Sequence, residues 1–308
     1  MTEIKKDIEL HDTNTFFREV LNLAGIGIMT LQSDRSIQFV NLEALKIFGY
    51  KPKDLSGINF NTLFHNDSQE HLEDILLKIN SLKTNNLPPI EFTGLHKDNS
   101  EFPIEITTSC NTSDEDTIYT IIIRDITDSK KNEEDLKHQA YFDQLTDIPN
   151  RTLFLDRAKN ALNQAKRSDD GLAIIFIDLD DFKEINDTLG HEAGDIMLKT
   201  LAQRFIKSAR NTDTVSRRGG DEFTILMPRI KNLEDAAILA ERILESNKEE
   251  IKIHNNSLYP KTSIGISVFP DDGDTIDILI KNADEAMYQA KESGKNRYAF
   301  YNSNIETL

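Results

Sequence analysis

The stretch DTVSRRGGDEFTILMP (213–228) reads as two strands joined by a tight Gly-Gly turn, with Asp221 and Glu222 directly after the glycines. Earlier in the chain, LAIIFIDLD (172–180) is an apolar run that enters a cluster of acids, which is typical of a buried strand ending in a functional loop. If these strands lie side by side, the acids that end the first one meet Asp221 and Glu222 at one edge of a sheet. The pairing of these strands therefore decides both the fold of this half and its site.

Four acids at one edge would need a compensating charge. Asp178, Asp180, Asp221 and Glu222 would repel one another unless divalent cations lie among them. Mg²⁺, held by one or two carboxylates and completed by waters and phosphate oxygens, is the usual solution. The alternative is that DLDD caps a helix and that GGDE is a common hairpin turn. The order of the two fragments, each beside a buried strand, favours the metal site.

The other elements beyond residue 143 indicate a mixed α/β unit. We expect a helix beginning near Ala193, helices over 232–247 and 278–293, and strands over 214–217, 223–227 and 261–269. The apolar strands would form the centre of a sheet, and the helices would cover it.

The first part of the chain indicates a smaller unit in which helices lie between strands. The expected helices cover 16–24, 41–50 and approximately Gln69–Leu82, and the expected strands are Ile26–Leu31, Ser36–Val40, Ile90–Leu95, Phe102–Ser109 and Tyr119–Arg124. This arrangement predicts one α/β unit of sensor size that ends near Thr127.

VNLEALKIFGYKPKDLSG (40–57) and the closing IIIRDIT (121–127) resemble the PAS family over residues 14–127. The resemblance implies a sensor domain with a cupped antiparallel sheet, whose pocket holds a ligand or is filled by a packed core. Cys110 is expected in a buried strand, since a flavin-adduct sensor would need a different sequence around it. The chain has no tryptophan, a residue that often stacks against a flavin. Its histidines are the residue type that binds haem, but nothing else in the sequence points to haem. The sequence therefore does not identify a ligand of the PAS unit.

Residues 128–142, DSKKNEEDLKHQAYF, are rich in helix formers and charge. Asn132, Leu136 and Gln139 follow the four-then-three spacing of a coiled-coil face, although that face is polar. The functional interpretation is a connecting signalling helix that pairs with its copy across a dimer and transmits strain. The alternative is an ordinary solvated linker helix, and the domains on either side favour the connector.

Further blocks extend the pattern of RGGDEF (218–223), namely DQLTDIPNR (143–151), FIDLDDFKEINDTLGHEAGD (176–195), SIGIS (263–267) and ADEAMYQAKESGKNRY (283–298). In this order they are similar to the GGDEF family of diguanylate cyclases. The resemblance implies a catalytic domain over 143–303 with a palm-like βαββαβ core and a central antiparallel sheet. The fold class expected for the whole chain is therefore α+β.

The resemblance to the GGDEF family implies a metal site at the sheet edge. Asp178 matches the carboxylate that binds Mg²⁺ (or Mn²⁺), with the Leu179 carbonyl as a further ligand. Asp221 matches a metal ligand that also accepts the proton of the 3′-hydroxyl, and Glu222 resembles another metal ligand.

The same resemblance implies a phosphate site. Lys183 matches the cation at the transferring phosphate, beside the backbone N–H groups of Asp181 and Phe182. Lys291 and Lys295 resemble the basic residues that hold the outer phosphates of GTP. One helical turn apart on an exposed face, these two lysines are alternatively a plain solvated pair.

Asn186 and Asp195 match the pair that hydrogen-bonds guanine, and His191 matches a further substrate contact. A carboxylate can accept from guanine N1–H and from its exocyclic amine, which adenine cannot offer. A buried acceptor left unpaired would therefore penalise ATP. His191 is alternatively a structural cap at the end of a loop.

Arg210-Asn211-Thr212-Asp213 precedes the Gly-Gly turn and resembles the RxxD product-inhibition element of the family. The resemblance implies that a dimer of cyclic di-GMP docks at Arg210 and Asp213, away from the active site, where the arginine fork grips phosphate or guanine. The alternative is that Arg210 caps the preceding helix through its last carbonyls.

The composition of the chain restricts the classes of protein to which it can belong. A length of 308 residues suits two domains, and 38% hydrophobic with 29% charged residues is typical of a soluble globular protein. A formal net charge of −17 argues against nucleic acid as a partner, because its backbone binds clustered Lys and Arg. No apolar run approaches the ~20 residues of a membrane span, and the single Cys110 excludes internal disulfides. We therefore expect a cytoplasmic protein without membrane insertion.

Together these patterns predict a diguanylate cyclase, which converts two GTP into cyclic di-GMP and two pyrophosphates. The reaction would need a homodimer, and the PAS unit with its connecting helix would control how often the half-sites meet. A receptor that only binds cyclic di-GMP is one rival, which the intact acids and Lys183 argue against. A cyclase acting on ATP is another, which Asn186 and Asp195 argue against.

Overall fold

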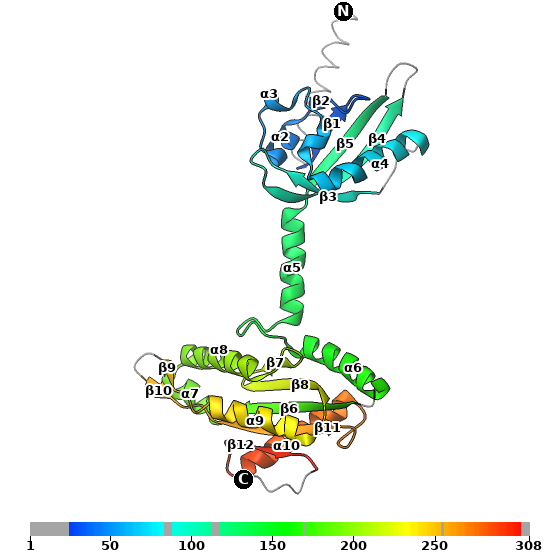
Figure 1. Ribbon diagram of the computed structural model, residues 1–308. Helices are drawn as coiled ribbons and strands as arrows, with labels where there is room; N and C mark the ends of the chain where they lie inside the picture. Colours follow the sequence, from blue (N-terminus) through cyan, green and yellow to red (C-terminus); the bar gives the residue numbers. More distant parts are fainter. Residues whose placement is uncertain (1–24, 83–87, 113–116, 169, 254–255, 303–308) are drawn as a thin grey trace, which may run out of the picture. The chain divides into compact units, whose positions relative to one another are not determined.

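The computed structural model describes residues 25–82, 88–112, 117–168, 170–253 and 256–302. The chain divides after Glu134 into two compact units, and each is described by itself (Figure 1). The helix expected over 16–24 lies outside the described residues.

A five-stranded antiparallel sheet forms the N-terminal unit, as the resemblance to PAS domains predicted (Figure 1). In the spatial order β2-β1-β5-β4-β3, its strands are β1 (Gly27–Leu31), β2 (Ile37–Val40), β3 (Ile90–Leu95), β4 (Glu101–Thr112) and β5 (Thr117–Asp125). The helices are α2 (Leu42–Phe48), α3 (Pro52–Leu55), the 3₁₀ turn η1 (Phe60–Leu63) and α4 (Asn66–Leu82). The side chain of Asn41 caps α2 by accepting from Ala44 N–H, and it also accepts from Ile28 N–H of β1, both at 2.9 Å.

Aromatic side chains fill the interior of this unit. The rings of Phe48 and Phe102 meet edge-on with 5.6 Å between centroids, and those of Phe60 and Phe64 do so at 4.8 Å. The interior described is thus a packed core of aromatic and aliphatic side chains. Cys110 is half-buried rather than buried as expected, because it lies where β4 leaves the core and the next two residues are exposed.

A single helix, α5 (Thr127–Tyr141), follows β5, where the sequence predicted a connecting helix. None of its residues is buried within the described chain, and Leu136 is 66% exposed. Within this chain, the face that carries Leu136 therefore gains no stabilisation from packing.

The C-terminal unit is built on a second five-stranded sheet (Figure 1). In the spatial order β12-β11-β6-β8-β7, its strands are β6 (Gly171–Leu179), β7 (Thr214–Gly219), β8 (Glu222–Ile230), β11 (Thr262–Phe269) and β12 (Arg297–Phe300). The four strands from β11 to β7 pair antiparallel, and β12 joins β11 in parallel. This is the palm-like arrangement that the sequence predicted, with β12 added at one edge.

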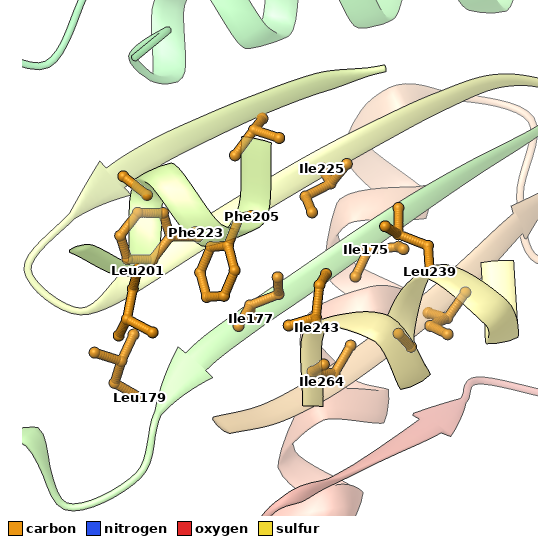
Figure 2. Packing of buried hydrophobic residues seen from close by; sticks show 14 of the residues in the cluster. Ile175, Ile177, Leu179, Leu201, Phe205, Phe223, Ile225, Leu239, Ile243 and Ile264 are labelled. Atoms are coloured by element: carbon orange, nitrogen blue, oxygen red, sulfur yellow. The ribbon is translucent and has the colours of Figure 1, made fainter. Parts of the chain in front are cut away.

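Helices cover both faces of this sheet, so its central strand is apolar on both sides. Ile175, Ile177 and Leu179 of β6 pack against one group of helices, and Figure 2 shows their contacts with side chains of α8 and α9. Leu172, Ile174 and Phe176, which alternate with them, pack against α6 and α10. The helices are α6 (Arg151–Ser168), α7 (Phe182–Leu189), α8 (His191–Ser208), α9 (Leu233–Ser246) and α10 (Ile276–Glu292).

Several elements were not predicted from the sequence, namely α3, η1, α6, α7, β12 and the small hairpin of β9 (Ile251–Ile253) and β10 (Asn256–Leu258). Gly265 explains how α10 can lie so close to β11. A Cβ atom at this position would collide with the backbone of Ala283 and Met287, so only glycine admits the helix.

Candidate active site at the β6–β8 edge

Two neighbouring strands bring the predicted acids together. Asp178 at the end of β6 lies directly opposite Glu222 at the start of β8. Opposed residues of an antiparallel pair project from the same face of the sheet, here the face that α6 and α10 cover. Asp221 lies in the turn before β8, close enough for its charge to act on Asp178. Gly219 and Gly220 adopt φ values of 145° and 55°, which glycine tolerates best, so the Gly-Gly turn is a conformational requirement.

The ammonium group of Lys291 on α10 lies beside these acids. Its Nζ is 2.6 Å from Asp178 Oδ1, and the two side chains are 30% and 12% exposed. Burial raises the pKa of the Asp178 carboxyl, Lys291 acts against this shift, and the charges of Asp221 and Asp180 raise the pKa further. Burial is the largest cause of the net upward shift, so the ionised Asp178 carboxyl is disfavoured at this edge despite the ion pair with Lys291.

Asp180, which was expected among the converging acids, is engaged in holding the fold. Ser263 Oγ donates to one of its carboxylate oxygens at 2.7 Å, and the backbone N–H of Asn296 donates to the other at 3.0 Å. The backbone N–H of Asp180 itself donates to the carbonyl of Lys261 at 2.9 Å. Asp180 therefore ties the end of β6 to β11 and to the segment before β12.

The loop after β6 presents the predicted phosphate-binding groups. Asp181 has φ 60° and precedes α7, Phe182 is buried at the first helical position, and Lys183 is exposed. Lys295 lies within reach of this loop, with its Nζ 2.6 Å from Asp181 Oδ1.

The prediction that Lys291 and Lys295 lie one helical turn apart on an exposed face was wrong. The helix ends at Glu292, and Lys295 follows a turn in which its own φ is 61°. The two lysines bind different acids, Asp178 and Asp181, so they are not a plain solvated pair.

The predicted guanine-binding residues lie on α7 and α8. Asn186 on α7 packs against Gly194 of α8, where a Cβ atom would overlap its amide oxygen. Asp195, the next residue, is exposed. This close approach of the two helices places Asn186 near the start of α8. His191 is exposed at the first position of α8, and Gly190 occupies the N-cap.

Arg210 and Asp213 of the RxxD element are not paired through their side chains. Asp213 accepts a hydrogen bond from the backbone N–H of Arg210 at 2.8 Å, which closes the turn after α8. The Arg210 guanidinium instead donates to Asp235 on α9 at 2.8 Å. The alternative in which Arg210 caps α8 through its last carbonyls is therefore not the arrangement observed.

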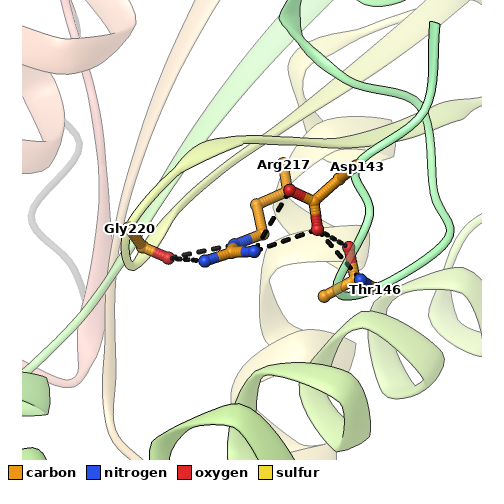
Figure 3. Close-up of polar contacts among 4 residues, drawn as sticks. All are labelled: Asp143, Thr146, Arg217 and Gly220. Carbon is orange, nitrogen blue, oxygen red and sulfur yellow. Dashed lines mark hydrogen bonds and ion pairs between the residues drawn. The ribbon is translucent and has the colours of Figure 1, made fainter. Parts of the chain in front are cut away.

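One ion pair beside the site was missed from the sequence. Arg217 of β7 donates to both carboxylate oxygens of Asp143, at 2.9 and 3.1 Å, and to the carbonyl of Gly220 at 3.0 and 2.7 Å (Figure 3). Thr146 adds two hydrogen bonds to Asp143. Asp143 stands in the DQLTDIPNR block, which was recognised without a role for its acid. The ion pair joins the segment after α5 to the Gly-Gly turn.

A cavity of about 1030 Å³ lies away from this edge, between α8 and α9. Lys199, Arg204, Lys207 and Arg242 are among its lining residues, but none of the predicted site residues is.

The residues at the edge fit a magnesium ion or a manganese ion by the chemistry of their donors. Asp178, Asp221 and Glu222 offer carboxylate oxygens, which these cations prefer as donors, and Asp178 and Glu222 project from the same face of the sheet. Among the described residues, no three His, Cys, Asp or Glu side chains gather into a group that could hold a metal. Mg²⁺ commonly keeps waters and takes phosphate oxygens, so fewer protein ligands suffice.

The comparisons with known proteins agree with this fold. A family model described as "Diguanylate cyclase, GGDEF domain" matches residues 140–297, and a PAS domain model matches residues 25–128. The chain therefore belongs to the GGDEF family. Within the part that the structure describes, no helix is long and apolar enough to cross a membrane.

The relatives match mainly the C-terminal unit. The chain is 42% identical to the diguanylate cyclase TpbB of Pseudomonas aeruginosa, over 52% of this chain and 37% of TpbB. It is 29% identical to the probable diguanylate cyclase DgcE of Escherichia coli, over 98% of this chain and 28% of DgcE. The chain thus spans about a third of the length of these relatives.

Solved structures show the same fold. The structure of a shortened TpbB that comprises only the GGDEF domain is similar with a TM-score of 0.51 and 38% identity, over 52% of this chain and 94% of that one. The coiled coil and GGDEF domain of DgcB from Caulobacter crescentus, in complex with c-di-GMP, gives a TM-score of 0.52 and 26% identity, over 57% of this chain and 93% of that one.

Proposed function

We propose that this chain is a diguanylate cyclase, which condenses two GTP molecules into cyclic di-GMP and two pyrophosphates. The observation that carries the proposal is the juxtaposition of Asp178 and Glu222 across β6 and β8, beside Asp221 and with Lys291 as a countercharge. Carboxylates on adjacent strands with cations close by suit phosphoryl transfer, in which positioning and charge compensation do most of the catalytic work. Membership of the GGDEF family supports the same activity.

Substrate binding would use the groups around the loop after β6. Lys183 and the backbone N–H groups of Asp181 and Phe182 would contact the phosphates of GTP. Lys291 and Lys295 would exchange their present acidic partners for the outer phosphates, which is feasible because both side chains are partly exposed.

Selectivity for guanine would come from α7 and α8. The Asp195 carboxylate can accept from N1–H and the exocyclic amine, and Asn186 can add a donor and an acceptor. His191 would contribute a further contact from the first turn of α8. Adenine would leave the carboxylate unpaired, which supports GTP over ATP as substrate.

In the chemical step, the Asp221 carboxylate would accept the proton of a GTP 3′-hydroxyl. The 3′-oxygen attacks the α-phosphorus of the other GTP, and the bond from that phosphorus to the pyrophosphate oxygen breaks. Asp178, the Leu179 carbonyl, Asp221 and Glu222 would hold Mg²⁺ or Mn²⁺, which would neutralise phosphate charge. Lys183 adds a fixed positive charge at the transferring phosphate.

Each catalytic domain would hold one GTP, so two copies must face each other and a homodimer is part of the mechanism. We propose a PAS sensor over 14–127, a signalling helix over 128–142 and a catalytic domain over 143–303. The exposed Leu136 face of α5 supports pairing between copies of this helix. The sensor would then shift how often the two half-sites meet.

Product feedback is proposed at Arg210 and Asp213. Arg210 is partly exposed, and its fork would have to leave Asp235 to bind cyclic di-GMP. An exposed ion pair of this kind is weak, so the exchange is energetically accessible.

The direct test is to incubate the purified chain with Mg²⁺ and GTP, ATP or both, and to identify the products by chromatography. The proposal predicts cyclic di-GMP and pyrophosphate from GTP, and no cyclic product from ATP alone. A receptor without catalytic activity would bind added cyclic di-GMP and leave GTP unchanged. A cyclic dinucleotide that contains adenine would assign the chain to another substrate class.

A further inference from the structure

A second, smaller cavity lies on the same face of the sheet as Asp178. It has a volume of about 290 Å³ and lies between α6, α10 and the end of β7. The cations Arg151, Arg218 and Lys281 line it, together with the acids Asp277 and Asp284. None of these five residues has a part in the catalytic steps described above.

Arg217 and Arg218 are neighbours in β7 with opposite surroundings. The guanidinium of Arg217 is fully engaged with Asp143 and the carbonyl of Gly220. Arg218 points to the other face of the sheet, where its Cζ lies 5.1 Å from the centroid of the Phe176 ring. The guanidinium also lines the cavity, so its N–H groups can donate to a ligand there.

The electrostatics of this cavity favour an anion. Burial lowers the pKa of Arg218, and the Arg151 guanidinium lowers it further, while Glu222 and Asp284 act in the opposite direction. The lowering prevails, with burial as its largest cause, and the Arg151 guanidinium lines the same cavity. An anion between Arg151 and Arg218 would relieve their repulsion and could accept hydrogen bonds from both.

The cavity is close to the proposed reaction site. Phe176, beneath Arg218, is two residues before Asp178 on the same face of β6. On α10, Asp284 precedes Lys291 by two turns, which corresponds to about 10 Å along the helix axis.

We propose that Arg218 and Arg151 form a phosphate-binding subsite beside the catalytic edge, which takes a phosphate group of the nucleotide carried by the facing copy. The assignment of the phosphate to the facing nucleotide rests on the proposed cyclase function, whereas the existence of the phosphate-binding subsite does not. The domain's own GTP has Lys183, Lys291 and Lys295 for its phosphates, so these arginines are left for a second one. Free pyrophosphate presents the same chemistry and is the other source to be distinguished.

Binding of inorganic pyrophosphate to the full chain, measured by calorimetric titration, tests the subsite. Arg218→Met and Arg151→Met should each weaken binding about 10-fold or more, because each removes charge-assisted hydrogen bonds. Lys159→Met, which removes a positive charge from the exposed side of α6, should leave the affinity unchanged. Equal affinities for wild type and both arginine variants would overturn the subsite.

Two further variants distinguish the subsite at Arg218 from the phosphate contacts of Lys291. In a Lys291→Met background, Arg218→Met should still weaken pyrophosphate binding, since distant contacts act additively. No further loss would mean that only one pyrophosphate position exists, and it would overturn the proposal. Arg218→Lys keeps the positive charge but loses the planar guanidinium that can donate two parallel hydrogen bonds. Its affinity for pyrophosphate should therefore lie between those of Arg218→Met and wild type. Circular dichroism melting curves would confirm that the variants fold.

Steady-state kinetics then identify the source of the phosphate. If Arg218 holds the nucleotide of the facing copy, Arg218→Met should raise the KM for GTP. If it holds pyrophosphate, the KM should stay constant and inhibition by added pyrophosphate should weaken, which would overturn the assignment to the facing nucleotide. Absence of cyclisation in wild type, with pyrophosphate binding that still needs both arginines, would reject the proposed function and leave the subsite. Cyclisation with binding that is independent of both arginines would reject the subsite alone.

Discussion

Lys291 Nζ on α10 lies 2.6 Å from Oδ1 of Asp178, the acid near the end of β6 that faces Glu222. In this ion pair, the ammonium group compensates part of the negative charge of the carboxylates at the edge. In the proposed mechanism, Lys291 would have to release Asp178 when metal and nucleotide bind, and its partly exposed side chain can do so.

Asp178→Asn should abolish cyclisation without lowering the melting temperature of the chain in the presence of a chelator. Burial and the charges of Asp221 and Asp180 disfavour the ionised Asp178, so a neutral amide of the same shape is tolerated. Mg²⁺ should raise the melting temperature of wild type by mass action, and this rise should be absent in the variant. Scanning calorimetry with and without Mg²⁺ measures both effects.

Glu285→Ala is the matched control, because Glu285 is an exposed acid on α10 away from the edge. It should keep the wild-type response to Mg²⁺. An Asp178→Asn variant that Mg²⁺ stabilises as much as wild type would remove Asp178 from the metal site.

Asn186→Ala and Asp195→Ala should narrow the preference for GTP over ATP. Each lost guanine contact typically costs ~1–3 kcal/mol, which is roughly a 5- to 150-fold loss in discrimination. Competition binding of GTP and ATP to the purified variants measures the change. Asp187→Ala, which removes an exposed acid from α7, should behave as wild type. If both variants keep full discrimination, the base is recognised elsewhere.

The sequence was informative wherever a residue's neighbours along the chain decide its position. An apolar run before Asp178 and a Gly-Gly turn before Asp221 indicated two strands with acids at their ends, and the register of Asp178 and Glu222 meets the condition that these strands lie side by side. Lys295 shows the opposite case. Its spacing from Lys291 suggested one helical turn, but the helix ends at Glu292 and a left-handed turn redirects the chain toward Asp181.

Arg217→Ala should destabilise the C-terminal unit by about 3 kcal/mol, because it leaves the partly buried Asp143 without its cation. Arg210→Ala breaks an ion pair of the same type in which the arginine is 48% exposed, and it should cost under about 1 kcal/mol. Urea unfolding of both variants gives the comparison. Equal losses would mean that burial of the Arg217 pair contributes no extra stability.

The Asp143 ion pair should also make stability depend on pH. Burial alone would raise the pKa of Asp143, but hydrogen bonds from Thr146 and Arg217 more than offset it and lower the pKa. Because the pKa is lower in the folded state, the ionised Asp143 stabilises the fold at any pH above the ordinary pKa of an aspartate. This stabilisation is lost as the pH falls through the pKa of Asp143 in the folded state. Asp143→Asn should therefore be less stable than wild type at neutral pH, with a difference that disappears in acid. A difference that persists unchanged below pH ~3 would contradict this linkage.

Such long-range partners explain what the sequence could not reveal. The pairs Arg217–Asp143 and Arg210–Asp235 join residues that are far apart in the chain, and no local pattern specifies them. Asp180 looked like one of several equivalent acids, and only its hydrogen bonds to Ser263 and Asn296 show that it holds the fold.

Arg210→Ala should leave the initial rate nearly unchanged and let product accumulate to higher levels before the reaction stalls. Feedback requires only that cyclic di-GMP bind a nonproductive arrangement better than the productive one. Rates measured against increasing cyclic di-GMP, for wild type and variant together, show the effect. Identical inhibition curves would remove Arg210 from the feedback site.

The central claim is that the β6–β8 edge joins two GTP molecules, and the most direct measurement is product formation by wild type and Asp221→Ala in parallel. Both proteins are incubated with GTP and Mg²⁺, and cyclic di-GMP and pyrophosphate are quantified over time. The account predicts one cyclic di-GMP for every two pyrophosphates from wild type, and no turnover from the folded variant, which lacks a metal ligand and the proton acceptor. Undiminished cyclisation by Asp221→Ala, or a wild type that consumes no GTP, would contradict it.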